Sequence, residues 1–182
     1  MHTARFLIIG TVAALGVGLV AAPASAAPTS DTVVTFEITA GTLDIVSPAT
    51  ADLLTGASGA VIAGQMGPVT VTDGRAATDA SWVGSVISGA FTTGGATPTE
   101  TVLANLVNYW SGPTTATTGD GTFTPGQPAV GAATPIDTLK PAMTHAGGTG
   151  NNSATWNPTL RINVPLANVA GIYTGTVTHS VA

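Results

Sequence analysis

The feature that most constrains the fold is an alternation of apolar and polar residues near the C-terminal end of the chain. Leu160, Ile162 and Val164 alternate with polar residues, which is the period of a β-strand with one buried face. Pro165 ends this run because it cannot donate to a strand ladder. A second alternating run follows Gly171 and places Tyr173, Val177, His179 and Val181 on one face. Two strands joined by a short polar connection predict a sheet-built domain that closes its core with its last segment.

Earlier segments repeat this pattern. Residues 32–40 alternate strictly, with Val34, Phe36, Ile38 and Ala40 on one face, and predict a strand that contributes to the core. The parity then changes at Gly41, which predicts a bulge or tight turn before the pattern resumes. Residues 69–72 predict another strand that ends at the turn signal Asp73-Gly74. Residues 81–91 predict a strand that bends or is buried on both faces.

Three segments give weaker signals. Residues 97–100 resemble a helix start, with Thr before Pro and Glu, but we interpret residues 102–110 as extended. Residues 111–135 are rich in Gly, Pro and Thr and predict a long loop or a set of irregular edge segments. Residues 146–152 predict a flexible connection. With seven to nine strands in all, the chain is expected to be all-β, an antiparallel β-sandwich.

The N-terminal residues 1–26 have the pattern of a signal peptide. A short basic start is followed by an apolar stretch and by Ala24-Ser25-Ala26, a small-residue cleavage site. An uncleaved membrane anchor is the competing interpretation, and the short, glycine-containing apolar stretch disfavours it. We therefore expect a secreted or cell-wall-associated protein with one domain, residues 27–182, and no membrane span after cleavage.

Composition narrows the function classes. The chain of 182 residues contains no cysteine, so an exported protein of this kind depends on its apolar core and not on disulfides. Its net charge is −5, with four basic and nine acidic residues. Nucleic acid and anionic lipid are therefore unlikely partners, because no basic patch is present to neutralise phosphates.

The sequence carries no pattern for catalysis or for a metal. His145 and His179 are the histidines outside the leader, and no cysteine is present to complete a zinc site. We interpret His179 as a packed or half-buried core imidazole and His145 as a solvated loop residue. Asp73 and Asp79 are a weak calcium signal, for which turn chemistry is the preferred interpretation. Neither a nucleophile elbow nor a facing carboxylate pair is recognisable, so we expect no enzyme, no cofactor and no metal.

The three tryptophans are the candidate binding side chains. Trp82, Trp110 and Trp156 could form a platform for stacking on sugars. Trp82 and Trp156 lie in or next to predicted strands, so we favour core positions for both. Trp110 follows Tyr109 and precedes Ser-Gly-Pro, which makes it the best candidate for an exposed aromatic side chain.

Three blocks together carry a family resemblance. TFEITAGTLDIV (residues 35–46), GPVTVTDGRAATDASWVGSV (residues 67–86) and LRINVPLANVAGIYTGTVTHSV (residues 160–181) resemble the WxL-domain family of Gram-positive cell-surface proteins. The resemblance implies a small exported, immunoglobulin-like β-sandwich. Trp82 matches the first family tryptophan, although Val83-Gly84 follows it. His179 stands where the second tryptophan would be.

The same resemblance implies non-covalent association with the cell wall through peptidoglycan, with Trp82, Trp110 and His179 as candidate binding residues. Two other functions remain open. The chain could instead be a structural or assembly subunit of a surface complex that binds another exported protein by its sheet edges or an exposed apolar face. A secreted hydrolase is the third and least favoured possibility.

The leader generates the first prediction. Cleavage after Ala26 is expected because the small residues at Ala24 and Ala26 fit the signal peptidase site. N-terminal sequencing of protein collected from the medium or the cell surface should begin at Ala27. Exported protein that still begins with Met1 would refute the cleavage site.

Overall fold

The computed structural model describes residues 28–182. The chain divides into two units between Glu37 and Ile38, and each is described by itself. In the first unit, residues 28–37 form no helix or strand and their side chains are exposed. The predicted signal peptide and its cleavage site lie outside the described residues.

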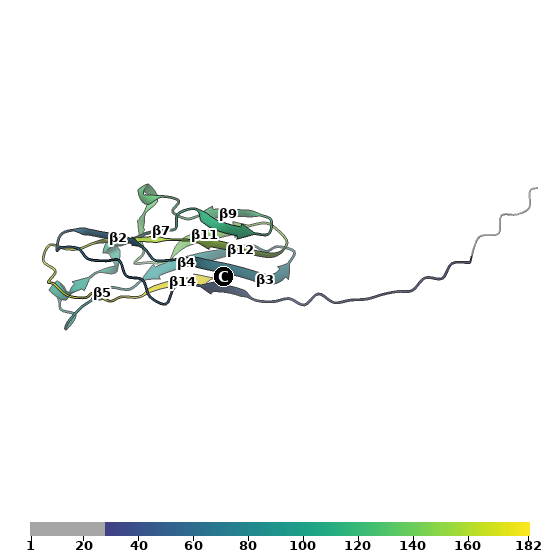
Figure 1. Cartoon of the computed structure of the whole chain (residues 1–182), viewed down its shortest axis with the longest axis horizontal. Helices are drawn as coiled ribbons and strands as arrows, with labels where there is room; N and C mark the ends of the chain where they lie inside the picture. The colour runs from purple at the N-terminus through teal and green to yellow at the C-terminus, as the bar shows by residue number, and fades with distance from the viewer. Residues whose placement is uncertain (1–27) are drawn as a thin grey trace, which may run out of the picture. The chain divides into compact units, whose positions relative to one another are not determined.

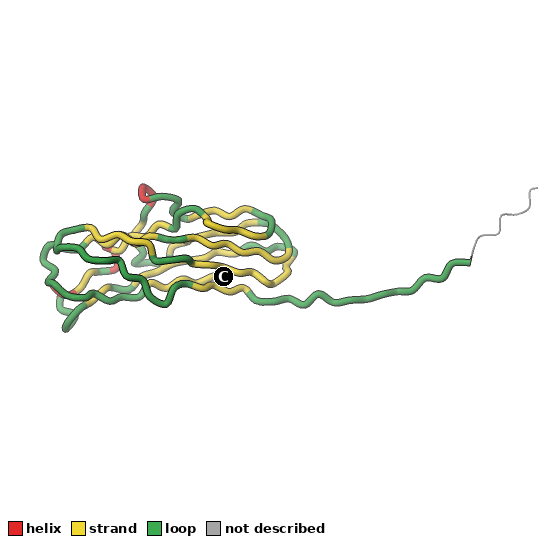
Figure 2. The backbone as a smooth tube through the Cα atoms, viewed as in Figure 1, coloured by secondary structure: helices red, strands yellow, loops and turns green. Residues whose placement is uncertain are grey.

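The second unit is all-β, with short strands and three single-turn 3-10 helices (Figure 2). Thr and Val are frequent in the strands and Gly in the connections between them, which suits pleated surfaces joined by tight turns. The elements are β1 (Leu43–Val46), β2 (Val61–Gln65), β3 (Val69–Ala77), β4 (Trp82–Ser88), β5 (Phe91–Thr92), η1 (Pro98–Glu100), β6 (Thr101–Val102), η2 (Ala104–Leu106), β7 (Val107–Trp110), β8 (Thr114–Thr118), β9 (Thr122–Pro125), η3 (Val130–Ala132), β10 (Thr134–Pro135), β11 (Lys140–Ala146), β12 (Gly150–Trp156), β13 (Thr159–Asn163) and β14 (Val177–Val181).

One layer of the domain contains two four-stranded sheets (Figure 1). They lie end to end, because strands of one sheet continue into strands of the other. Their orders are β1-β3-β12-β8 and β10-β7-β13-β2. β2 leads into β3 through Gly67-Pro68, and β12 leads into β13 through Asn157-Pro158. The registers agree with this continuity, because Trp156 lies opposite Val69 and Thr159 lies opposite Gln65. These two proline breaks therefore divide two long strands without ending the layer.

The second layer is the sheet β14-β4-β11-β9, and every strand pair in the domain is antiparallel. The two layers pack through alternating inward side chains, and this confirms the predicted antiparallel β-sandwich. Its core includes Val69, Val71, Val86, Tyr109 and Trp156, all fully buried. The immunoglobulin-like strand order stays a prediction.

The predicted strand at residues 32–40 is wrong. These residues have no strand partner, and Phe36 and Ile38 are 86% and 77% exposed and do not join the core. An isolated strand has no ladder bonds to hold it, whatever its side-chain pattern. The parity change at Gly41 is nevertheless real: the Gly41 amide donates to the Gly74 carbonyl, and Leu43 and Ile45 of β1 pack against the core.

Further predictions needed correction. β3 continues through Asp73-Gly74, which is not a turn, because the Gly74 amide bonds to Thr42 of the neighbouring edge. Residues 102–110 contain the single turn η2 between β6 and β7 and are not uniformly extended. For residues 111–135, the second of the two predicted alternatives is confirmed: this segment contains β8, β9 and β10, and each of them is an edge strand of its sheet. The predicted connection at residues 146–152 is shorter: only residues 147–149 join β11 to β12, and Asn152 is buried within β12.

The C-terminal pattern is confirmed in part. Leu160 and Ile162 are buried on β13, and Val177, His179 and Val181 alternate with exposed residues along β14. Tyr173 lies before β14 and packs against the core from outside a strand. Among residues 28–182, none of the helices has the length and apolar character needed to cross a membrane.

The core and the exposed segment give a paired prediction. Leu160 is 3% exposed within the core, so Leu160→Ala should lower the free energy of unfolding by about 2–5 kcal/mol. Phe36→Ala should change it by less than about 0.5 kcal/mol, because the exposed ring has no packing to lose. Urea unfolding of both variants is the measurement. A large loss in Phe36→Ala would contradict the exposed placement.

Candidate functional site

A large apolar groove of the described domain lies between two loop segments. One wall is residues 51–58 and the other is residues 169–175, and the groove has a volume of about 710 Å³. Its floor consists of apolar side chains from the first layer (Ile62 and Ile162), from the separate two-stranded sheet β5-β6 (Phe91 and Val102), and of Val164 just after β13. At the point where the walls meet, the Ser58 hydroxyl donates to the Asn168 carbonyl. The groove therefore opens directly onto the inside of the sandwich.

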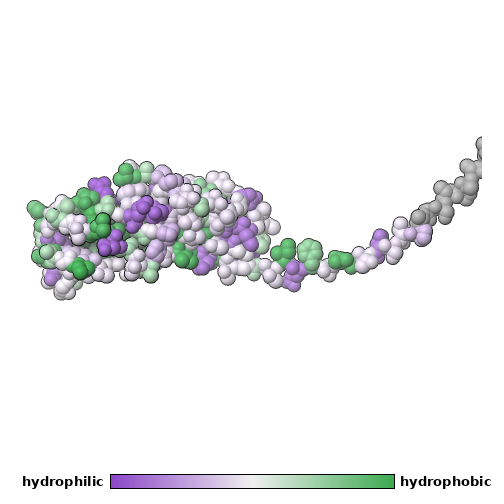
Figure 3. Space-filling model, viewed as in Figure 1, coloured by the Kyte–Doolittle hydropathy of each residue, from purple (hydrophilic) through white to green (hydrophobic). Residues whose placement is uncertain are grey.

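Large apolar side chains stand exposed around this groove. Leu54 and Ile172 line it and are 81% and 88% exposed, and Leu166 contacts the turn at Gly59 next to one wall and is 83% exposed. The space-filling view shows hydrophobic patches at the end of the domain where β2 and β5 lie (Figure 3). Exposed apolar surface around a hollow is typical of interaction sites.

The backbone at Leu54 is also unusual. Its φ is 70°, a left-handed conformation that is unfavourable for a bulky residue. The Leu54 amide donates to the Asp52 side chain, which stabilises the local turn. The exposed Leu54 side chain therefore stands at the groove wall on a backbone conformation that costs free energy.

The chemistry of the groove is that of apolar binding. Asp52 is the one charged residue among those lining it. The Tyr173 hydroxyl is used within the fold, since it donates to the backbone carbonyl of Val169 at 2.9 Å, with that of Thr99 at 3.2 Å as the alternative acceptor. Both walls are largely free of regular secondary structure. The groove thus offers apolar side chains and backbone amide and carbonyl groups to a ligand.

Trp82, the first sequence-predicted site residue, is in the core. It is 2% exposed at the start of β4, and its indole N–H donates to Asn152 Oδ1 at 2.8 Å. Asn152 in turn reaches Asp73 Oδ2 at 3.4 Å. The buried indole has no free face on which a sugar ring could stack. This agrees with the core position that the sequence favoured for Trp82 and for Trp156.

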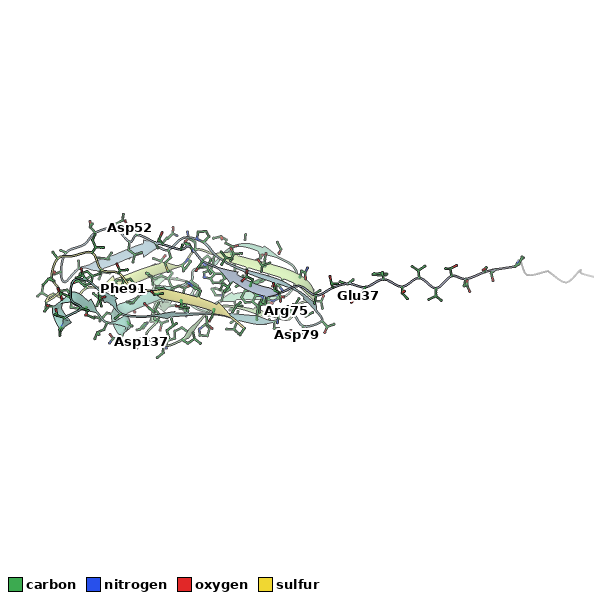
Figure 4. All side chains as sticks on the ribbon, turned by 90° about the horizontal axis from the view of Figure 1, so that it is seen from below. Glu37, Asp52, Arg75, Asp79, Phe91 and Asp137 are labelled. Atoms are coloured by element: carbon green, nitrogen blue, oxygen red, sulfur yellow. The ribbon has the colours of Figure 1, made fainter. Side chains whose placement is uncertain are left out.

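Asp73 and Arg75 form a charged pair beside Trp82. Arg75 donates from Nε and Nη2 to the two carboxylate oxygens of Asp73 at 2.9 and 2.7 Å. These bonds lower the pKa of Asp73 and keep its buried carboxylate charged. Figure 4 shows Arg75 and Asp79 at one end of the domain and Asp52 and Phe91 towards the other. The pair is a structural anchor remote from the groove.

His145 is not the solvated loop residue that the sequence suggested. It is 2% exposed on β11, and its ring lies between two backbone carbonyls: Nδ1 is 2.8 Å from the oxygen of Ala80 and Nε2 is 2.9 Å from that of Asp120. The ring stacks on Phe123 with centroids 4.4 Å apart. His145 therefore holds two loops against one end of the second layer.

His179 is a half-buried core residue, as predicted. Its Nε2 lies 3.2 Å from the hydroxyl of Tyr109, which accepts the indole N–H of Trp156 at 3.0 Å. Burial lowers the pKa of His179 to about 4, so it stays neutral where a solvated histidine would become charged. Burial also raises the pKa of Tyr109.

The structure does not bring the three candidate residues into one site. Trp82 belongs to the Asp73 cluster, and His179 belongs to the Tyr109–Trp156 cluster. Trp110 is half-buried on β7, opposite Thr159 of β13. Within residues 28–182, no group of three or more His, Asp or Glu side chains is placed to hold a metal ion.

Sequence reasoning missed the groove and the Asp73 cluster. The sequence does contain a signal for Asp73. In the alternation along β3, Asp73 falls on the same buried face as Val69 and Val71, and a buried carboxylate requires a partner. The groove had a weaker signal: Leu54 and Ile172 are large apolar residues outside the predicted strands. Comparisons of the chain with protein-family models, curated proteins and solved structures found no match. The resemblance to WxL domains therefore stays a prediction.

The His179 environment generates a pH prediction. The pKa of a histidine in the unfolded chain is about 6.5 and that of folded His179 is about 4, so the unfolded state binds the proton first as pH falls. The free energy of unfolding should decrease between about pH 6.5 and pH 4, by up to about 3 kcal/mol, and be unaffected by this group above pH 6.5.

Urea unfolding of the parent and His179→Gln across this pH range measures the effect. Gln keeps a polar side chain but does not titrate, so its stability should decline less over the same range. Equal slopes for the two proteins would show that His179 is not held neutral by burial.

Proposed function

We propose that the chain is a structural or assembly subunit of an extracellular complex, and that its apolar groove binds an extended segment of another exported protein. The observation that carries the proposal is the groove itself, with Leu54 and Ile172 exposed along its walls. Apolar surface of this kind costs free energy in water, at roughly 25 cal/mol per Å², and a protein partner recovers that cost on binding.

The groove favours an extended peptide over a compact ligand. Its walls are two loop segments, each seven or eight residues long, with a floor of apolar side chains between them. An extended segment presents side chains to alternate faces, so it can fill such a floor on one side and bond to the wall backbones along its edges.

Peptidoglycan association, which the family resemblance implies, remains the alternative. Buried Trp82 and half-buried His179 give it little support, because sugar stacking needs an accessible ring face. A hydrolytic function has less support still, because the groove carries a single carboxylate, Asp52, and general acid–base chemistry at such a site needs a second positioned group. Export to the cell surface is part of the proposal and rests on the predicted signal peptide.

Leu54→Asp tests the groove. The substitution places a charge in an apolar hollow, and Asp tolerates the left-handed backbone of this position better than Leu, so the fold should be kept. We expect the yield of cross-linked partner protein on the surface of producing cells to fall about tenfold or more. Sedimentation with purified peptidoglycan should be weak for parent and variant alike.

Leu139→Asp is the matched control, because Leu139 is also an exposed leucine but does not line the groove. It should retain the parent's cross-linking yield, and thermal melts should be similar for all three proteins. Strong peptidoglycan binding by the parent, unchanged in Leu54→Asp, would overturn the proposal in favour of the wall-binding alternative.

A further inference from the structure

We propose that the occupant of the groove is residues 32–40 of a second copy of the same chain, so that the protein assembles head to tail. This inference rests on the proposed function, because it names the partner of the same groove. Two observations carry it: a strand-patterned segment that has no partner, and an apolar groove from which that segment of the same chain is excluded by distance.

Residues 32–40 have the alternating sequence pattern of a strand but form no strand in the structure. Val34, Phe36 and Ile38 alternate with Thr35, Glu37 and Thr39, yet all three apolar side chains are largely exposed. A segment that alternates so regularly gains from pairing only if one face is buried. Within the described residues this face is not buried, so burying it requires a surface that residues 28–182 of the same copy do not supply.

The groove supplies what the segment lacks. Its floor is apolar, which suits the Val34, Phe36 and Ile38 face. Backbone groups in the walls are open to pairing, since residues 51–57 form no strand or turn and Thr174 makes only an isolated bridge to Thr92. Adding a strand in this way satisfies backbone groups and buries alternate side chains at the same time.

A chain cannot fill its own groove. The Gly41 amide is bound to the Gly74 carbonyl of β3, and Ile62 on the groove floor is twelve residues before Gly74 along the β2–β3 strand, a distance of about 40 Å. Phe36 is five residues from Gly41, and such a segment reaches at most about 18 Å even when fully extended. The occupant must therefore belong to another molecule.

This geometry also sets the form of the assembly. The segment departs from the domain at the Gly74 end of β3, and the groove lies at the β2 end of the same long strand (Figure 1). Each copy then offers a segment at one end and a groove at the other. Such a contact is heterologous and leaves a free segment and a free groove after each addition, so it produces open chains or rings instead of closed dimers.

Light scattering of the purified exported protein over a range of concentrations tests the inference. The parent should form dimers and longer species as concentration rises. Phe36→Asp should remain monomeric, and its thermal melt should match that of the parent because Phe36 is exposed. Thr35→Asp, a change on the opposite face of the same segment, is the matched control and should still assemble.

Mixing two monomeric variants gives the sharper test. Phe36→Asp keeps an intact groove and Leu54→Asp keeps an intact segment, so their mixture should form one-to-one dimers that do not grow further. A parent that stays monomeric at every concentration would overturn the inference, as would assembly that persists in Phe36→Asp.

The outcomes also separate this inference from the proposed function. A monomeric parent that still cross-links to a different exported protein, in a manner lost in Leu54→Asp, would leave the groove as a protein-binding site and remove only the second copy as its occupant. Loss of both self-assembly and groove-dependent cross-linking would overturn both proposals.

Discussion

The packing of two antiparallel layers around Trp156 and Tyr109 is the interaction on which the rest of the structure depends. Both side chains are fully buried, and the indole N–H of Trp156 donates to the Tyr109 hydroxyl, so two large aromatic residues enter the core without an unsatisfied donor. With no cysteine in the chain, no disulfide supplements this core. Stability therefore depends on how completely the inner faces of the layers are covered.

The two ends of the core differ in how completely the domain shields them from solvent. The proposed function depends on this difference. At the β3 end, polar clusters complete it: Arg75 neutralises Asp73, and His145 lies between two backbone carbonyls. At the β2 end, the layers are bridged by loop segments, and Ile62 and Ile162 lie at the floor of an open groove. Apolar surface that the domain does not cover for itself is available to a partner.

Much of the layer structure could be predicted from alternation, because a strand buried on one face shows its period in the sequence. Leu160, Ile162, Leu43 and Ile45 occupy the positions that this period indicates. Alternation does not reveal where the pairing strand comes from, which is why residues 32–40 were assigned to the core. His145 was misplaced for a related reason: its carbonyl partners, Ala80 and Asp120, are 65 and 25 residues away and belong to loops. The groove arises from how the loops cross the end of the sandwich, and residue types alone do not specify that path.

The central claim is that residues 32–40 become a strand when they enter the groove of another copy. Amide hydrogen exchange of the exported protein, compared at low and high concentration, tests it most directly because strand pairing protects backbone amides. The account predicts that residues 32–40, 51–58 and 169–175 all become protected together as concentration rises, while exchange in the core strands is unchanged. Rapid exchange of residues 32–40 at every concentration, with assembly present or absent, would contradict it.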